Sequence, residues 1–372
     1  MARILINFTS PYPNKLTGIS TYVWRIVEAL HVHGRHDYVL ATNWTIDHIP
    51  AAIVKLGLPI VHRTLPINET LALATNTFCL PRLMREVGAS LIFHTQPVAM
   101  FAGMQDSVTV LHDLYRASHP HLFDSAQVLQ WRHVTSRGFC KSGRLIAVSE
   151  ATRTTALRCY PALAGRISVV HEASPIDGGP EELLRNEERE WAFGLMVANI
   201  TRNKNIELLF RALTLLAQEG LRPRIMLVGR DDVGLLPGLM ARYPHADVVQ
   251  AGSQSEESLA ELYATASAYI NTSTVEGFCL PILEAQTLGL PVVCTDIPVL
   301  REVAGEGAAF IDPEDPRSLA GVLRSLVEQP AMRADLRTKG RLNCKRFSWK
   351  KAAKETEDIF DSLLAERANQ RN

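Results

Sequence analysis

The chain has 372 residues, too many for one ordinary hydrophobic core, so two domains of similar size are expected. Its residues are 47% hydrophobic and 21% charged, and 39 Lys and Arg balance 39 Asp and Glu. This balance provides no overall field that would attract nucleic acid or a membrane, so any basic patch must be local.

Short runs rich in β-branched residues alternate with helical patterns along the chain. In the first half we predict strands at residues 3–8, 38–42, 90–95, 108–113, 145–149 and 167–172. In the second half we predict strands at residues 194–199, 224–229, 246–252, 267–273, 291–296 and 308–312. These runs are continuously apolar, which is typical of parallel strands covered by helices on both faces.

The elements predict an α/β protein with two doubly wound, Rossmann-like domains that face each other across a cleft. The first covers residues 1–172 and the second residues 191–345. Residues 173–190 are rich in Gly, Pro and acids and lack apolar periodicity, which is typical of an interdomain linker. Residues 346–372 are predicted to form an amphipathic helix that frays into a polar tail.

In the first domain, two segments that come after strands are candidates for ligand binding, because ligands of such sheets bind beyond the carboxyl ends of the strands. Gly18 lies in a polar turn before a helix that Ser20 or Thr21 could cap, so the turn could approach a phosphate or simply cap the helix. His112 and Asp113 end the fourth predicted strand. The histidine could orient a substrate, donate to it or exchange a proton with it, or form a structural pair with the acid.

In the second domain, Arg202 and Lys204 come between a strand and a helix. Arginine can bind a phosphate through two parallel hydrogen bonds, and lysine can bind it as a point charge. The same segment, taken alone, could equally be a solvated basic loop.

Two glutamates bracket the start of another predicted helix. Pro281 suits a first helical turn, so we predict a helix from Leu280 to Gly289. Glu276 then lies in the preceding loop, and Glu284 lies one turn inside the helix. Backbone N–H groups at the positive end of this helix would form an anion site. They belong to Gly277, Phe278, Cys279 and Leu280. On their own, Glu284 could instead be an acid that favours the helix dipole and Glu276 a solvated loop acid.

A basic segment in the first domain could contact a membrane. Residues 131–144 interleave Trp131 and Phe139 with basic side chains, a composition that suits anionic lipid. The basic residues are Arg132, Arg137, Lys141 and Arg144. A helix with a solvated face is the alternative interpretation.

Other enzyme classes lack their motifs in this chain. There is no GxGxxG after the first strand, no GxxxxGK[ST] and no GxSxG, which argues against NAD, P-loop and α/β-hydrolase chemistry. No DxD comes after a strand in the first half, and Asp231 and Asp232 are adjacent acids in the second domain. We therefore expect no metal site and no cofactor.

Six scattered cysteines without a CxxC pair argue against a zinc site and a disulfide framework, and suggest reduced thiols. The first residues lack the apolar core of a signal peptide, and no run of about 18 apolar residues occurs. We expect a cytoplasmic protein that could lie at the inner face of a membrane.

The sequence resembles the retaining glycosyltransferases of family 4, which have a GT-B fold. The segment EGFCLPILEAQTLGLPVVCTDIPVLREV matches their E-x7-E signature and the residues next to it. NITRNKN is similar to their phosphate-binding basic loop, TGIS to their N-terminal glycine loop, and HDLY to their active-site histidine segment. RFSWKKAAKETEDIF is similar to their ending. The resemblance covers nearly the whole chain and is strongest between residues 195 and 312.

The resemblance implies roles for these residues. Glu284 would hold the ribose hydroxyls, and Glu276 with the amides of residues 277–280 would hold the transferred sugar and the diphosphate. Lys204 matches the family's donor-phosphate lysine. The family's arginine several positions earlier is replaced by Ala198 and Asn199, so either Arg202 could substitute for it or Lys204 could act alone. Gly18 would approach the donor phosphates, and His112 would face the transferred sugar.

We therefore expect a transferase that moves a sugar from a nucleotide-diphosphate donor to a hydroxyl of a glycan or lipid-linked saccharide. Resemblance to bacterial polysaccharide mannosyltransferases suggests GDP-mannose as the donor. Two alternatives are an NDP-sugar epimerase with a GT-B fold and a non-enzymatic two-domain protein that binds a sugar or nucleotide.

Overall fold

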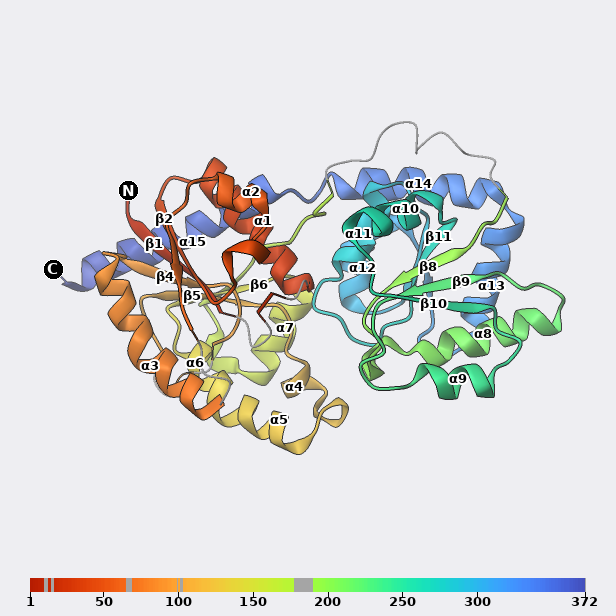
Figure 1. Cartoon of the computed structure of the whole chain (residues 1–372), viewed down its shortest axis with the longest axis horizontal. Helices are drawn as coiled ribbons and strands as arrows, with labels where there is room; N and C mark the ends of the chain where they lie inside the picture. Colours follow the sequence, from red (N-terminus) through yellow and green to blue (C-terminus); the bar gives the residue numbers. More distant parts are fainter. Residues whose placement is uncertain are drawn as a thin grey trace. The chain divides into compact units, whose positions relative to one another are not determined.

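The computed structural model describes residues 1–9, 13–14, 17–64, 69–98, 100, 103–176 and 190–371. The chain divides into two compact units, Met1–Ala173 with Ser348–Asn372, and Ser174–Phe347. Each unit contains one parallel sheet (Figure 1). Most of the linker predicted at residues 173–190 lies outside the described residues.

The first unit contains a seven-stranded parallel sheet of order β3-β2-β1-β4-β5-β6-β7. Its strands are β1 (Arg3–Phe8), β2 (Asp37–Thr42), β3 (Ile60–His62), β4 (Leu91–His94), β5 (Ser107–Leu111), β6 (Arg144–Ala147) and β7 (Ile167–Val169). Six were predicted. The sequence prediction missed β3, a three-residue edge strand whose side chains are only partly buried. The order reverses direction between β1 and β4, which makes the carboxyl ends of these two strands a topological switch point.

The first unit also contains helices, most of which connect these strands. They are α1 (Gly18–His33), α2 (Ala51–Lys55), α3 (Glu69–Glu86), α4 (Tyr115–Ser118), α5 (Ser125–Gln130), α6 (Ser136–Cys140), α7 (Glu150–Cys159) and α15 (Trp349–Arg371). None of the helices in the described part of the chain is long and apolar enough to cross a membrane.

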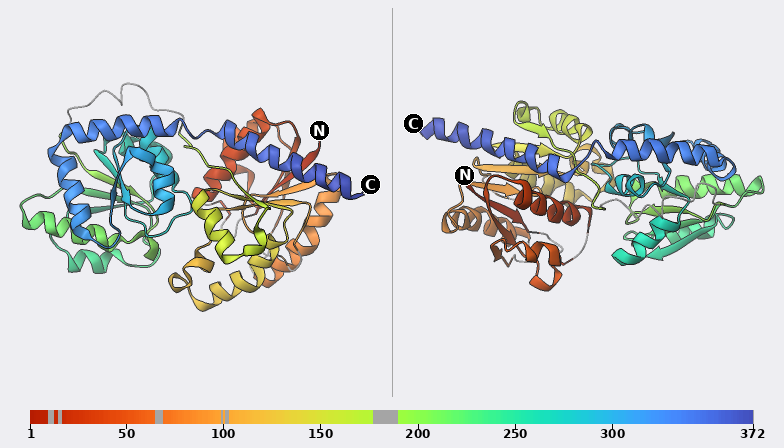
Figure 2. Two further views of the ribbon diagram at one scale, coloured as in Figure 1. Left: turned by 180° about the vertical axis from the view of Figure 1, so that it is seen from behind. Right: turned by 90° about the horizontal axis from the view of Figure 1, so that it is seen from above.

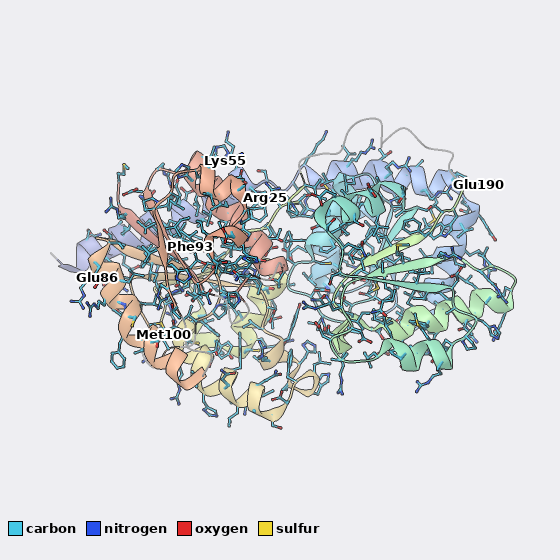
Figure 3. The ribbon with its side chains drawn as sticks, viewed as in Figure 1. Arg25, Lys55, Glu86, Phe93, Met100 and Glu190 are labelled. Atoms are coloured by element: carbon cyan, nitrogen blue, oxygen red, sulfur yellow. The ribbon has the colours of Figure 1, made fainter. Side chains whose placement is uncertain are left out.

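The last helix, α15, returns to the first unit and packs beside α1 (Figure 2). Its Phe360 ring lies 5.2 Å from that of Phe93, which is labelled in Figure 3 and belongs to the fully buried strand β4. The Glu357 carboxylate is 2% exposed and accepts a hydrogen bond from the Tyr38 hydroxyl at 2.6 Å. The final helix is therefore held to the first unit by apolar and polar contacts.

The predicted lipid-facing aromatics of residues 131–144 lie inside the protein. Trp131 and Phe139 are buried and belong to one core cluster, and the Trp131 indole donates to the Tyr160 hydroxyl at 3.0 Å. Arg132 and Arg137 are exposed. The interpretation of these aromatics as membrane contacts is wrong, because they are core residues; the segment is a helical one with a solvated basic face.

The second unit contains a six-stranded parallel sheet of order β10-β9-β8-β11-β12-β13. Its strands are β8 (Gly194–Val197), β9 (Ile225–Val228), β10 (Val248–Gly252), β11 (Ala268–Asn271), β12 (Val292–Thr295) and β13 (Ala308–Ile311). All six were predicted. The helices are α8 (Ile206–Gln218), α9 (Leu236–Arg242), α10 (Glu256–Thr265), α11 (Leu280–Thr287), α12 (Pro298–Ala304), α13 (Pro316–Glu328) and α14 (Pro330–Cys344).

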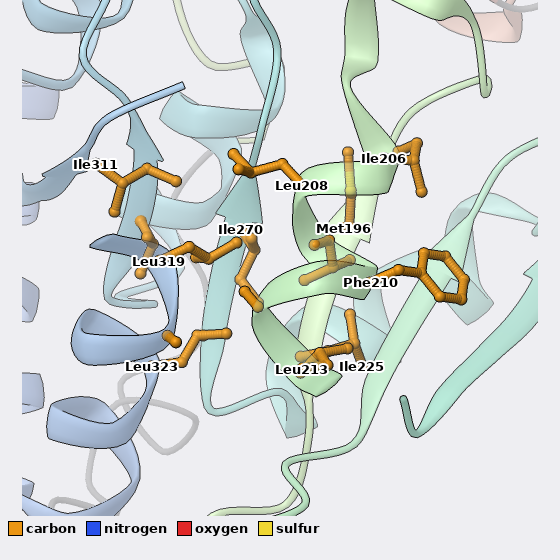
Figure 4. Close-up of a cluster of buried hydrophobic side chains, with 14 of the residues drawn as sticks. Met196, Ile206, Leu208, Phe210, Leu213, Ile225, Ile270, Ile311, Leu319 and Leu323 are labelled. Carbon is orange, nitrogen blue, oxygen red and sulfur yellow. The ribbon is translucent and has the colours of Figure 1, made fainter. Parts of the chain in front are cut away.

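The core of the second unit lies between its sheet and the helices α8 and α13 (Figure 4). Leu213 of α8 and Leu323 of α13 are buried with Ile225 and Ile270 of the sheet. The apolar stripe of each helix packs on continuously apolar strands, as expected for a doubly wound unit. This packing fixes the loops that come after β8 and β11.

Candidate active site

One group of candidate residues lies in the second unit, at the switch point of its sheet. Strands β8 and β11 are neighbours there, although β9 and β10 come between them in the chain. The loops after these two strands are joined, because the Thr274 amide donates to the Asn203 carbonyl at 2.8 Å. The Thr272 hydroxyl also donates to the Lys204 carbonyl at 2.7 Å. Segments about 70 residues apart in sequence thus form one rigid edge.

Lys204 and Glu276 meet across this edge. The Lys204 ammonium donates to Oε1 of Glu276 at 2.5 Å, and the Ser273 hydroxyl donates to the same oxygen at 2.6 Å. The lysine side chain is 18% exposed and the glutamate side chain 9%. An ammonium has three N–H donors, so Lys204 can bind an anion while it keeps its contact with Glu276.

Arg202 is placed differently from Lys204, although both lie in the turn η6 (Arg202–Lys204). Arg202 is exposed, and the described part of the chain offers its side chain no ion pair. Asn205 ends the turn with φ 48°, and its side chain donates to the Pro313 carbonyl at 2.9 Å. Asparagine adopts this left-handed conformation more readily than most residues, so it suits the sharp entry into α8.

Helix α11 starts at Leu280, as predicted, and ends at Thr287 before Gly289. Its N-cap residue Cys279 has φ 82°, and Pro281 lies in the first turn. A non-glycine residue in this conformation is strained, and such strain is often found at binding sites. Gly277 and Phe278, just ahead of the cap, are both buried.

Glu284 lies one turn into α11. The Tyr263 hydroxyl of α10 donates to Oε2 of Glu284 at 2.7 Å, and the glutamate side chain is partly buried. Burial raises the pKa of Glu284, and the Tyr263 hydrogen bond opposes that shift in pKa. The tyrosine fixes one carboxylate oxygen, which orients the side chain for a second partner.

Another group of candidate residues lies in the first unit, at the end of β5. Nε2 of His112 lies 2.9 Å from the Thr95 carbonyl oxygen, and Nδ1 lies 3.1 Å from Oε1 of Glu172. The Tyr22 ring of α1 stacks edge-on against the imidazole, with 4.7 Å between the ring centroids. The His112 side chain is 11% exposed. His112 is thus held in one orientation from three directions.

The partners of His112 define where its protons lie. A carbonyl oxygen only accepts, so Nε2 carries a proton and donates to Thr95. Nδ1 and Oε1 of Glu172 share one hydrogen bond, so the second ring nitrogen is engaged by the carboxyl group. In this arrangement both ring nitrogens are engaged by protein groups, so neither presents a free lone pair to a substrate. Asp113 lies outside this pair, since its carboxylate accepts from the Tyr115 amide at 3.3 Å.

Gly18 is the first residue of α1, and Thr17 caps the helix. Ser20 and Thr17 form a reciprocal capping box, in which the Ser20 amide donates to the Thr17 hydroxyl at 3.2 Å. The predicted caps Ser20 and Thr21 are therefore wrong. The error arose because Gly18 is helical, so the helix starts earlier in the chain than predicted and its N-cap is Thr17. Gly18 is exposed, and a Cβ there would meet open space.

Sequence reasoning missed four residues that hold the candidate groups. Glu172 and Ser273 come after strands, so the strand-end rule could have found both. Thr95 acts through its backbone carbonyl and Tyr263 reaches the site from a preceding helix, which no local pattern reveals. Within the described ranges, no three His, Cys, Asp or Glu side chains lie together in a way that could hold a metal ion.

Two family models match successive parts of the chain. Glycosyltransferase Family 4 matches residues 16–173, and Glycosyl transferases group 1 matches residues 181–343. Together they cover the loops that carry the candidate residues of each unit. The chain is a family 4 glycosyltransferase.

A curated relative is similar in sequence over nearly the whole of this family 4 glycosyltransferase, and solved structures share its fold. O-antigen chain mannosyltransferase B of Escherichia coli is 26% identical over 381 residues, which cover 96% of this chain and 100% of the relative. The crystal structure of WaaG, a glycosyltransferase involved in lipopolysaccharide biosynthesis, has a TM-score of 0.72 at 16% identity, with 96% and 99% of the two chains covered. Anabaena Alr3699/HepE in complex with UDP-glucose has a TM-score of 0.70 at 17% identity, with 97% and 100% covered.

The predicted family and the predicted GT-B fold are therefore confirmed. The glutamates of the E-x7-E signature correspond to Glu276 in the loop after β11 and Glu284 in α11. As a family 4 enzyme, the glycosyltransferase is of the retaining type and uses a nucleotide-sugar donor.

Proposed function

We propose that this glycosyltransferase transfers mannose from GDP-mannose to a hydroxyl of a glycan or a lipid-linked saccharide. The observation that carries the donor half of this proposal is the Lys204–Glu276–Ser273 cluster at the switch point of the second sheet. The choice of mannose is supported by relatives named as mannosyltransferases, among them O-antigen chain mannosyltransferase B and RfbU of Salmonella typhimurium.

The proposed donor site uses the second unit. Lys204 and the start of α11 bind the diphosphate, because a cation and the positive end of a helix both favour negative charge. Glu276 keeps the lysine in place and accepts from hydroxyls of the transferred sugar. Glu284, held at one oxygen by Tyr263, accepts from the ribose hydroxyls with the other. The first unit binds the acceptor, and its Gly18 loop and His112 contact the donor.

The proposed reaction keeps the anomeric configuration. The bond between the anomeric carbon and the diphosphate oxygen breaks, and its electron pair leaves with the diphosphate. The acceptor oxygen forms its bond on the same face, and its proton passes to the departing phosphate oxygen. Lys204 stabilises the charge that develops on the leaving group, which is the electrostatic contribution expected of a fixed cation.

Product formation tests the proposed donor. The purified chain, with GDP-mannose and a lipid-linked saccharide acceptor, is expected to give a mannosylated product, and UDP-glucose and dTDP-glucose are expected to give less. In this proposal Lys204 and the start of α11 neutralise the diphosphate charge without a metal ion. Activity is therefore expected to persist in EDTA. Faster transfer from UDP-glucose would contradict the choice of mannose, and strict dependence on added Mn²⁺ or Mg²⁺ would contradict the charge assignment.

Replacing Glu284 by alanine is expected to weaken the binding of free GDP about 10- to 100-fold, since hydrogen bonds to a charged group contribute about 1.5–3 kcal/mol. A role limited to the helix dipole would cost only about 0.3–1 kcal/mol of folding stability and would leave affinity unchanged. Isothermal titration calorimetry and thermal melting separate these roles. Tyr263→Phe is the control, because it removes the hydroxyl that orients Glu284 but keeps the carboxylate, and its loss of affinity should be smaller.

A further inference from the structure

Two arginines are almost fully buried in the described part of the chain, and they differ in their partners. Arg333 is 5% exposed and donates to the Leu326 and Val327 carbonyls at the end of α13. Those carbonyls form the negative end of a helix, which satisfies a buried cation. Arg63 is 8% exposed and comes directly after β3 in the first unit. Among the described residues, no helix end provides Arg63 with carbonyl partners of this kind.

Arg63 has one hydrogen bond from its side chain within the described ranges. Its Nη1 donates to Oδ1 of Asn7 at 3.2 Å, whereas its Nη2 is buried without a hydrogen-bond partner. No carboxylate of the described residues forms an ion pair with it. A guanidinium cannot lose its charge in a protein, and burying it unpaired is costly. Such a group is expected to have an anionic partner.

The hydrogen bond from Arg63 determines the hydrogen-bond directions of its neighbours Asn7 and His94. Since Oδ1 of Asn7 accepts from Arg63, the Asn7 amide nitrogen donates to Nδ1 of His94, 3.2 Å away. The remaining ring nitrogen of His94 therefore carries the proton. Burial, with the nearby Arg63 charge, lowers the pKa of His94 to about 3, so this ring adds no second positive charge. Arg63 is the cationic member of this buried group.

The same group connects to His112 along the carboxyl edge of the sheet. Asn7 lies in β1 and His94 ends β4, the two strands that flank the switch point of the first unit. The Thr95 hydroxyl donates to the Asn7 carbonyl at 3.1 Å, and the Thr95 carbonyl accepts from His112. Hydrogen bonds therefore link the arginine with the candidate histidine at the edge where ligands of such sheets bind.

We propose that Arg63 binds an anionic group of the acceptor, a phosphate or a carboxylate, at the carboxyl edge of the first sheet. This inference rests on the proposed function, in which the first unit binds the acceptor. The planar guanidinium presents parallel donors that match the oxygens of either anion. The acceptor is thereby restricted to molecules that carry a negative charge near the reacting hydroxyl, such as a lipid-linked saccharide diphosphate or a glycan that contains a sugar acid.

Binding of small anions to the full chain tests this subsite without any transfer reaction, so its outcome is separate from that of the donor assay. Methyl phosphate and glucuronate are titrated by NMR, with methyl α-glucoside as the neutral probe. We expect at least one anion to bind the wild type and Arg63→Met to weaken that binding at least 10-fold. The anion that binds shows whether the acceptor group recognised by Arg63 is a phosphate or a carboxylate.

Three further variants complete the experiment. Arg63→Lys keeps the charge but not the paired donors, is expected to weaken binding less than Arg63→Met, and serves alone if Arg63→Met does not fold. Arg3→Met is the matched control, because Arg3 is an exposed arginine of β1 that pairs with Asp37. Lys204→Met identifies binding in the donor site. Equal affinity in the wild type and both Arg63 variants would overturn the proposal, as would loss of all anion binding in Lys204→Met or no preference over methyl α-glucoside.

Discussion

Replacing Lys204 by methionine is expected to lower kcat/KM for the sugar nucleotide about 10³-fold, the effect of removing one fixed group that stabilises charge in a transition state. The lysine ammonium is joined to the Glu276 carboxylate at 2.5 Å and is therefore held at the carboxyl edge of the second sheet. Arg202, in the same turn, forms no such pair among the described residues and is not expected to replace it. Steady-state kinetics with the best donor measure the change.

The same substitution also affects folding, and the two effects can be separated. Without Lys204, the Glu276 carboxylate remains nearly buried, and an uncompensated charge in such a place costs about 3 kcal/mol of the free energy of unfolding. The double variant Lys204→Met with Glu276→Gln removes this charge, so it should recover stability but not activity. Lys339→Met is the control, because Lys339 forms an exposed pair with Asp335 in the same unit. Activity of the single variant within a few-fold of wild type would rule out the phosphate role.

The carboxyl edge of the second sheet combines the Lys204–Glu276 ion pair with strained backbone. Cys279 and Asn205 both have positive φ, and each is the residue before a helix that borders the Lys204–Glu276 pair. Strained residues persist only where the surrounding packing fixes them. Here that packing comes from the buried strands β8 and β11 and from the loop contacts between Asn203 and Thr274. The fold thus presents the lysine and the start of α11 in a fixed arrangement before any ligand binds.

The strands could be predicted from sequence because their apolar runs are continuous, and their polar ends mark the loops that carry Lys204, Glu276 and His112. Edge strand β3 is short and partly exposed, so its pattern is weak. The helix cap at Thr17 depends on whether Gly18 takes helical dihedrals, which its residue type leaves open. Tyr263 and Thr95 come to the site through tertiary packing, and Arg63 becomes notable only because, among the described residues, it is buried without an anionic partner.

Replacing His112 by alanine is expected to lower kcat about 10²- to 10³-fold while the product remains α-linked. The imidazole donates from Nε2 to the Thr95 carbonyl and is paired through Nδ1 with Glu172, so neither ring nitrogen is free to act as a base toward a substrate. A positioning role depends on its orientation and charge, and the loss of a fixed group near the reacting atoms reduces the rate by this order. Kinetics and proton NMR of the new glycosidic linkage measure the rate and the anomeric configuration.

Glu172→Gln and His31→Ala distinguish positioning from base catalysis. The side-chain oxygen of a glutamine at position 172 can still accept from Nδ1 of the histidine, so Glu172→Gln keeps the ring in place and removes the negative charge. This variant is expected to lose less activity than His112→Ala. His31 is exposed in the last turn of α1, and its replacement should change nothing. An inverting enzyme needs a base on the face opposite the leaving diphosphate, and would give a β-linkage from an α-configured donor. A β-linked product would therefore overturn the proposed mechanism, whereas near-normal turnover in His112→Ala would remove the histidine from it.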